Sequence, residues 1–262
     1  MLCLHGFTQN ADVFRKRTGA IRKALKSKVD FVFVDGPHSA AGAFPDAERR
    51  AFDAGEAEGE GGVGPRAWWL VGENAERASM PSEASGSSRA TEPGEAEGRR
   101  DDGRGAVPVP AAGTWTRPAL SRQMRGWDES AALIRDAVAT HGPFDGVLAF
   151  SQGASTAALA LALIPELAAS VTFAVLVGGF EPMDPEMAAK LPGGGEDSNA
   201  ARLAARSLHV HGANDAMVSR QRTEALMGAF VDPELFVHQG GHGIPAGGDF
   251  RARLKAFILD GE

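Results

Sequence analysis

Short apolar segments alternate with helical segments along most of this 262-residue chain, and this alternation constrains the fold more than any other feature. Apolar segments that are separated by helices cannot pair as hairpins, so they are expected to lie parallel in one sheet. Because a parallel sheet is buried on both faces, helices should cover both of its sides. We therefore predict an α/β fold with a mostly parallel central sheet, in a single domain over residues 1–262. The expected strands are 1–4, 31–34, 146–150, 173–177, 207–211 and 235–238, and the expected helices are 13–25, 126–140, 151–164, 219–230 and 249–259.

Residues 39–118 interrupt the alternation and form a predicted insertion within this domain. Gly, Ala, Glu, Arg and Ser dominate the segment, and residues 72–113 contain no Leu, Ile, Phe or Trp. Such a composition buries too little apolar surface to offset the entropy of ordering the chain, so we expect residues 72–113 to be flexible. Trp68, Trp69 and Trp115 are exceptions to this composition, because they place large apolar side chains within the insertion. They would either anchor the ends of the insertion to the domain or contact a substrate.

Composition excludes several classes of protein. The chain has 27 Lys and Arg against 34 Asp and Glu, a net charge of −7, which argues against binding to nucleic acid. Its single cysteine, Cys3, allows no internal disulfide and no cysteine zinc site. No apolar run of 18 residues and no secretory signal pattern are present, so we expect no membrane span and a cytoplasmic location. No spacing typical of metal ligands and no phosphate-binding loop appear, so no metal and no cofactor are predicted. The oligomeric state stays open.

The segment 149–153, Ala-Phe-Ser-Gln-Gly, carries the strongest local signal for chemistry. A serine on a sharp turn from a strand to a helix is lifted above the sheet, and small neighbours are needed because the backbone is crowded there. The usual pattern is Gly-x-Ser-x-Gly, and Ala149 here replaces the first glycine. The pentapeptide alone fits equally well a Ser151 that only caps the following helix.

Two further residues make Ser151 a candidate nucleophile. Asp215 follows the predicted strand 207–211, and His242 lies in a Gly-rich loop after strand 235–238. A serine needs a base to take its proton, the base needs a carboxylate to orient it, and the order Ser, Asp, His is the one this kind of fold uses. All three follow strand ends, where catalytic groups of parallel sheets gather.

Other acidic and histidine residues are weaker candidates. Asp184 and Asp232 precede prolines, which usually marks a turn or a helix start. His211 is close enough in sequence to Asp215 to be an alternative partner for it. Structural roles are expected for the histidines within strands or at a helix end, namely His209, His238 and His141.

An oxyanion needs two backbone N–H donors that are already in place. The residue after the nucleophile, Gln152, supplies one, and the loop after the first strand offers Phe7 for the second. An ordinary tight turn at His5-Gly6 is the alternative reading of that loop.

Six segments of the chain carry motifs of a known family: Leu2–Asn10, 31–38, 66–69, 142–153, 207–210 and 240–245. Together these motifs resemble the FSH family of serine hydrolases, in the branch of the ovarian tumour suppressor candidate hydrolase. The resemblance implies an α/β-hydrolase fold and a carboxylic ester hydrolase, with thioesterases and long-chain acyl hydrolases among the relatives. It implies Ser151 as nucleophile, Asp215 as acid and His242 as base. Ala149 and the long insertion depart from the family pattern, as does the absence of tyrosine.

We therefore predict an esterase that acts on a small-molecule ester. Trp68, Phe180 and Ile244 are candidate walls of the substrate pocket, each equally explicable as core packing. A thioesterase with the same machinery, and a binding or scaffold protein with little turnover, are the alternatives.

Overall fold

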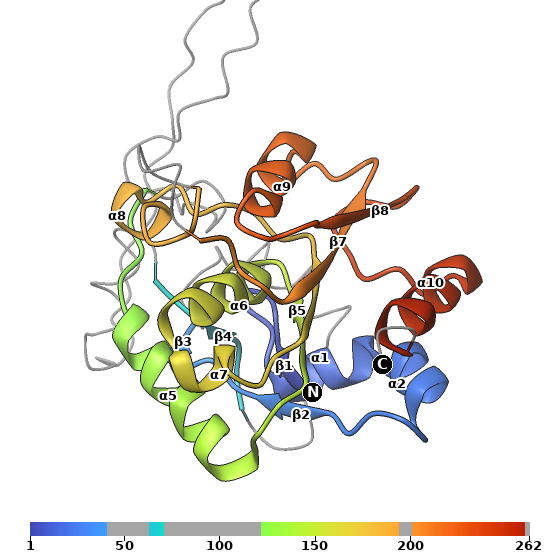
Figure 1. The fold of residues 1–262 in the computed structure, drawn as a ribbon, viewed down its shortest axis with the longest axis horizontal. Helices are drawn as coiled ribbons and strands as arrows, with labels where there is room; N and C mark the ends of the chain where they lie inside the picture. Colours follow the sequence, from blue (N-terminus) through green and yellow to red (C-terminus); the bar gives the residue numbers. More distant parts are fainter. Residues whose placement is uncertain (41–62, 71–121, 194–200, 260–262) are drawn as a thin grey trace, which may run out of the picture.

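A computed structural model describes residues 1–40, 63–70, 122–193 and 201–259, and its centre is a six-stranded sheet (Figure 1). The strand order is β2-β1-β5-β6-β7-β8, and every pair of neighbours is parallel. The prediction of an α/β fold is thus confirmed. The strands are β1 (Leu2–Leu4), β2 (Val32–Val34), β5 (Gly146–Phe150), β6 (Phe173–Val177), β7 (Arg206–Gly212) and β8 (Glu234–His238).

Helices cover both faces of the sheet, as the burial pattern of the strands requires. In β5, Val147 and Ala149 pack into one core layer while Leu148 and Phe150 pack into the other, because successive side chains point to opposite faces. The first layer contains α5 (Trp127–His141), α6 (Gln152–Leu163), α7 (Pro165–Ala168), α8 (Pro185–Ala188) and α9 (Arg220–Met227). The second contains α1 (Ala11–Arg17), α2 (Gly19–Leu25) and α10 (Gly248–Leu259).

The single helix predicted over residues 13–25 is instead two helices, α1 and α2, with Thr18 between them. The Thr18 hydroxyl donates a hydrogen bond to the carbonyl of Phe14 at 2.8 Å, and Gly19 follows directly. A threonine that bonds back onto the preceding turn bends a helix, and a glycine weakens it. The apolar spacing of the helical segment was predicted correctly, but the break at Thr18 was not predicted.

Most of the predicted insertion 39–118, including 72–113 and Trp115, lies outside the described residues. Its described parts are residues 39–40 and 63–70. The second contains β4 (Arg66–Ala67), which pairs antiparallel with β3 (His38–Ser39). Trp68 and Trp69 are buried there, which matches the reading of these residues as anchors. In the part of the chain that the structure describes, no helix has the length and apolarity needed to cross a bilayer.

Because two histidines are buried, we predict that the protein loses stability in mild acid. Burial lowers the pKa of His5 to about 4 and that of His209 to about 3, against 6.5 in water. Between about pH 6.5 and pH 4, these two histidines therefore bind protons in the unfolded chain but stay neutral in the folded protein. Full stability is present above about pH 6.5 and is lost as the pH falls toward 4, by up to about 2.7 kcal/mol per pH unit for two protons.

Urea unfolding at pH 7 and pH 5 measures this loss. His209→Leu should weaken the pH dependence, because it removes one of the two groups. The exposed His141, changed to Leu in the same way, is the control and should leave the dependence as it was. Equal midpoints at the two pH values in the unmodified protein would contradict the prediction.

Candidate active site

Ser151 lies on a strained turn between β5 and α6. Its backbone is in an unusual conformation, with φ 52° and ψ −118°, and its N–H donates to the carbonyl of Val177 at 2.8 Å. Gly153 is required two residues later, because a Cβ there would lie 2.4 Å from the carbonyl oxygens of Leu4 and His5. Ser151 precedes α6 without a side-chain cap bond to it, so its hydroxyl does not do the capping work that the alternative reading gave it.

Three side chains that are far apart in sequence form one chain of hydrogen bonds. The distance from Ser151 Oγ to His242 Nε2 is 2.8 Å, and that from His242 Nδ1 to Asp215 Oδ2 is 2.7 Å. With Nδ1–H donating to the carboxylate, Nε2 is left to accept the proton of the serine hydroxyl. The structure thus brings the three predicted residues together after β5, β7 and β8, at the carboxyl edge of the sheet.

The carboxylate of Asp215 is buried and well supplied with donors. Its Oδ1 accepts from the N–H groups of Met217 and Val218 at 2.8 and 2.9 Å, and only 1% of its side chain is exposed. Burial raises the pKa of Asp215, but the hydrogen bond and charge of His242 and the two amide donors outweigh it, so the pKa is lowered. Asp215 therefore stays ionised and holds the orientation of the imidazole.

Backbone contacts join the loop that carries Asp215 to the loop that carries His242. The N–H of Asn214 donates to the carbonyl of Gly240 at 3.1 Å, and its side-chain amide donates to the carbonyl of Gln239 at 2.7 Å. At Gly212 a Cβ would lie 2.3 Å from the carbonyl of Gly241, so only glycine permits this approach. The two loops therefore fix the His242–Asp215 pair as one unit.

The weaker candidates lie where structural roles would place them. His211 is near Thr223, with Nδ1 3.3 Å from Oγ1, and it is not the hydrogen-bonded partner of Asp215. Asp184 caps α8 by accepting from two backbone N–H groups, and Asp232 occupies a turn with φ 45°. The remaining histidines lie in β7, in β8 and in the last turn of α5, as expected for His209, His238 and His141.

The loop after β1 is held by His5, whose part was not anticipated from the sequence. Gly36 N–H donates to His5 Nε2 at 2.8 Å, so Nδ1 carries the proton and donates to the carbonyl of Gly6 at 2.7 Å. The side chain of Gln9 accepts from the Gly6 N–H at 3.0 Å. Phe7, the predicted second oxyanion donor, lies within this braced loop.

The side chain of Gln152 makes contacts that sequence analysis missed. Its Oε1 accepts from the Trp68 N–H at 2.8 Å, and its Nε2 donates to the Trp69 carbonyl at 2.9 Å. The Trp68 indole N–H also donates to the carbonyl of His5 at 2.8 Å. Gln152, the residue after the candidate nucleophile, thus links residues 63–70 to the start of α6. The amide at position 152 was the only sequence signal for this contact.

The candidate pocket walls are mostly buried. Trp68 and Phe180 are 0% and 1% exposed, and Phe180 packs edge-on to Trp69 with ring centroids 6.3 Å apart. Ile244 is half-buried beside the core layer of α1, α2 and α10. Packing accounts for the first two side chains in this structure, and contact of the three with substrate stays a prediction.

Gly178 gives a direct test of the position of His242. Its φ is +58°, and a Cβ there would lie 2.9 Å from Cε1 of His242. We expect Gly178→Ala to displace the imidazole and to lower kcat by about 10- to 100-fold, since small misplacements of reacting groups are costly. Gly243→Ala is the matched control in the loop of His242, because a Cβ there meets no atom within 4 Å. Steady-state kinetics of both variants decide the matter, and equal kcat values would contradict the prediction.

Gln152→Leu tests the contact with the Trp68–Trp69 segment. It leaves a buried N–H and a buried carbonyl unpaired, so the free energy of unfolding should fall by about 2–4 kcal/mol. Gln221→Leu, the same change on the exposed surface of α9, should alter stability by less than about 0.5 kcal/mol. Urea unfolding followed by tryptophan fluorescence measures both variants. An unchanged midpoint for Gln152→Leu would refute the role given to its side chain.

No group of three or more His, Cys, Asp or Glu side chains that could hold a metal ion occurs among residues 1–40, 63–70, 122–193 and 201–259.

Comparisons with known proteins point to one family. The family model described as serine hydrolase (FSH1) matches residues 1–254. Esterase OVCA2 of Homo sapiens is 32% identical over 268 residues, covering 98% of this chain and 94% of that protein. Esterase C25G4.2 of Caenorhabditis elegans is 29% identical over 265 residues, covering 99% and 92%.

Solved structures with low sequence identity share the fold. SOBER1 of Arabidopsis thaliana aligns with a TM-score of 0.53 at 15% identity, covering 99% of this chain and 96% of that one. Esterase PE8 aligns with a TM-score of 0.52 at 18% identity, covering 99% and 90%. The expected α/β-hydrolase fold is therefore confirmed, and the matching family model, which spans nearly all of the sequence, assigns the chain to the FSH1 family of serine hydrolases.

Proposed function

We propose that this serine hydrolase cleaves carboxylic esters through an acyl-enzyme, with Ser151 as nucleophile, His242 as general base and Asp215 as its orienting acid. The observation that carries the proposal is the continuous hydrogen-bond chain from Ser151 through His242 to Asp215, with links of 2.8 and 2.7 Å. The esterase names of its relatives support carboxylic esters as the substrate class.

In the first half-reaction, Ser151 Oγ attacks the ester carbonyl carbon while its proton moves to His242 Nε2. The tetrahedral intermediate collapses, the bond from carbon to the alcohol oxygen breaks, and His242 returns the proton to the departing alcohol. In the second half, His242 takes a proton from water, the hydroxide attacks the acyl carbon, and the carboxylic acid leaves as Ser151 regains its proton. Asp215 remains an anion throughout and stabilises the imidazolium.

The negative charge that develops on the carbonyl oxygen of the substrate needs hydrogen-bond donors close to Ser151. Gln152 is the first residue of α6, and the first N–H groups of a helix have no partner within the helix. We assign its backbone N–H as one oxyanion donor and that of Phe7 as the other. Each such donor contributes about 10²- to 10³-fold to the rate.

A thioester could serve as substrate, because the same acyl transfer releases a thiol in place of an alcohol. A catalytically weak binding protein is the alternative from a different class. The ionised Asp215 and the paired His242 favour catalysis, since a binding protein has no need of an activated serine. We also infer that residues 1–262 act as one domain, with 39–118 inserted in it.

The decisive experiment compares kcat/KM for p-nitrophenyl esters and matched acyl thioesters from two to sixteen carbons. Faster turnover of esters at every chain length is expected. Faster turnover of thioesters would transfer the assignment to a thioesterase. Tight binding of a substrate analogue without reaction of a fluorophosphonate probe would support the binding protein and overturn the proposed function.

A further inference from the structure

A second candidate site lies in the most basic stretch of the chain. Residues 13–29 carry seven Lys and Arg side chains and no Asp or Glu, although the whole chain has a net charge of −7. Four of the six lysines of the protein fall within these seventeen residues. Such a concentration of one sign of charge is typical of a surface that attracts an anion.

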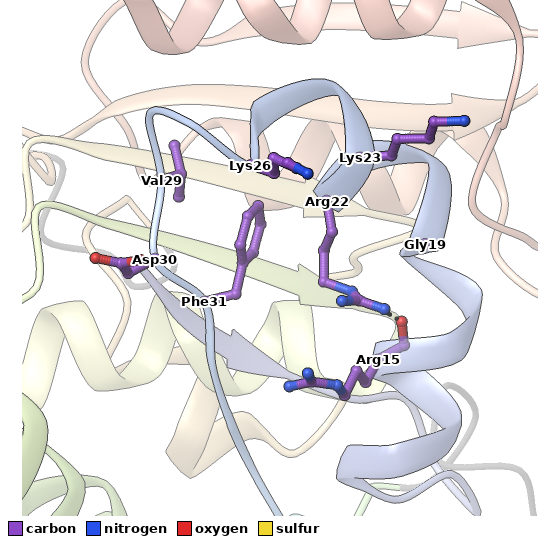
Figure 2. A pocket seen from close by; sticks show the side chains of 8 residues that line it. All are labelled: Arg15, Gly19, Arg22, Lys23, Lys26, Val29, Asp30 and Phe31. Atoms are coloured by element: carbon purple, nitrogen blue, oxygen red, sulfur yellow. Dashed lines mark hydrogen bonds between the residues drawn. The ribbon is translucent and has the colours of Figure 1, made fainter.

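These residues border a pocket of about 340 Å³ between α2 and the start of β2 (Figure 2). Arg15, Arg22, Lys23 and Lys26 line it from the side of α1 and α2, and Val29 and Phe31 line it from the segment that leads into β2. A volume near 300 Å³ is at the small end of ligand pockets, so a small molecule is the fitting occupant.

The two arginines contact the same aromatic ring. Their guanidinium carbons lie 5.9 and 6.0 Å from the centroid of the same ring, that of Phe33, and Arg22 Nε donates to the backbone carbonyl of Arg15 at 3.1 Å. Stacking on an aromatic face orders a guanidinium without neutralising it. Both side chains are therefore positioned while their charge stays available to an anion.

No carboxylate of the described residues forms an ion pair with Arg15, Arg22, Lys23 or Lys26. Asp30 also lines the pocket, but Figure 2 shows its side chain directed away from the two arginines. An anion that bridged these cations would remove their mutual repulsion, and a phosphate group suits paired guanidinium groups because it accepts bidentate hydrogen bonds.

An apolar face completes the pocket. Phe31 is half-buried and lies nearly parallel to Phe33, with an interplanar angle of 17° and ring centroids 6.3 Å apart. Figure 2 shows the Phe31 ring near the centre of the pocket, with Val29 on one side and Arg22 on the other. A planar organic group could pack there while an attached phosphate meets the cations.

We propose that this pocket binds a small organic phosphate, with its phosphate held by Arg15, Arg22 and Lys26 and its organic part against Phe31. The site is separate from the hydrolase centre. The pocket precedes β2, whereas Ser151, Asp215 and His242 follow strands, so the two sites lie at opposite edges of a parallel sheet. A strand of five residues such as β5 spans on the order of 16 Å.

Calorimetric titration with inorganic phosphate and phenyl phosphate tests the proposal on the full chain. Both should bind, phenyl phosphate more tightly, and Arg15→Gln/Arg22→Gln should weaken both by at least tenfold. Arg135→Gln/Arg202→Gln removes the same charge from exposed sites elsewhere and should leave both affinities within twofold. Equal weakening by the two double variants would reduce the effect to net charge and overturn the site.

Two further variants separate the parts of the pocket. Phe31→Leu should reduce the preference for phenyl phosphate over phosphate, because it removes the planar face and keeps the cations. Ser151→Ala should bind phenyl phosphate as the unmodified protein does, and loss of binding there would place the ligand in the hydrolase centre. Melting temperatures without ligand identify any variant that fails to fold. If Arg15→Gln/Arg22→Gln fails to fold, Lys23→Gln/Lys26→Gln replaces it as the test of the cationic side chains. Binding to vesicles of anionic lipid without binding to either soluble phosphate would refute a small-molecule site.

Discussion

Ser151→Ala is expected to lower kcat for p-nitrophenyl ester hydrolysis by roughly 10⁴- to 10⁶-fold, the largest effect predicted for this protein. The substitution removes only the hydroxyl group, whose Oγ lies 2.8 Å from His242 Nε2. Without it no acyl-enzyme can form, so the oxyanion donors and substrate binding alone would supply the residual rate. After incubation of Ser151→Ala with a fluorophosphonate probe, no labelled protein should be found.

The fold of this variant should be unchanged, because the Ser151 hydroxyl makes no cap bond to α6. Ser155→Ala serves as the matched control. Its hydroxyl donates to the Phe180 carbonyl at 2.6 Å, so the change costs stability but leaves the labelled serine in place. Probe labelling that persisted in Ser151→Ala and disappeared in Ser155→Ala would identify Ser155 as the labelled residue and refute the assignment of Ser151.

Asp215→Asn should lower kcat by about 10⁴-fold while leaving KM near its original value. The change keeps the shape of the side chain but removes the charge that stabilises the imidazolium. An amide that donates to the imidazole also favours the tautomer with its proton on Nε2, which cannot accept from Ser151. The low pKa of Asp215 indicates that the folded protein holds the anion, so the loss of charge should be felt at neutral pH.

Steady-state kinetics of Asp215→Asn and His211→Asn distinguish the two possible partners in this region. His211 contacts Thr223, so its replacement should change kcat less than tenfold. If His211→Asn lost as much activity as Asp215→Asn, the orienting role of Asp215 would have to be shared. A pH-rate profile of Asp215→Asn with partial recovery at high pH is also expected, since hydroxide can take the serine proton that the wrong tautomer of His242 cannot accept.

Much of the architecture was readable from local patterns in the sequence. The β5 and β6 strands have the predicted limits, because continuous apolar runs ended by Gly and Ser leave few alternatives. The break at Thr18 was missed, since a side-chain bond to the preceding turn leaves the apolar spacing intact. Helices as short as α7 and α8 have too few turns to produce a periodic signal.

The candidate site was only partly readable. The residue types, their order and their places after strand ends were all in the sequence, so Ser151, Asp215 and His242 could be selected. The clamp of Gln152 on Trp68 joins residues 84 positions apart, and no local pattern encodes such a contact. The cationic residues 13–29 were visible as charges, but their arrangement around Phe31 depends on how α2 meets β2.

The sequence by itself determined the parallel α/β layout and the set of groups available for acyl transfer, because strand and helix periodicities are local properties of the chain. The tertiary structure alone decided that the hydroxyl, the imidazole and the carboxylate lie within hydrogen-bond distance. Those contacts span 91 and 27 residues, and they depend on the register of β5, β7 and β8 and on the close approach of two loops at Gly212. Register and loop approach are set by packing of the whole sheet, which no short segment specifies.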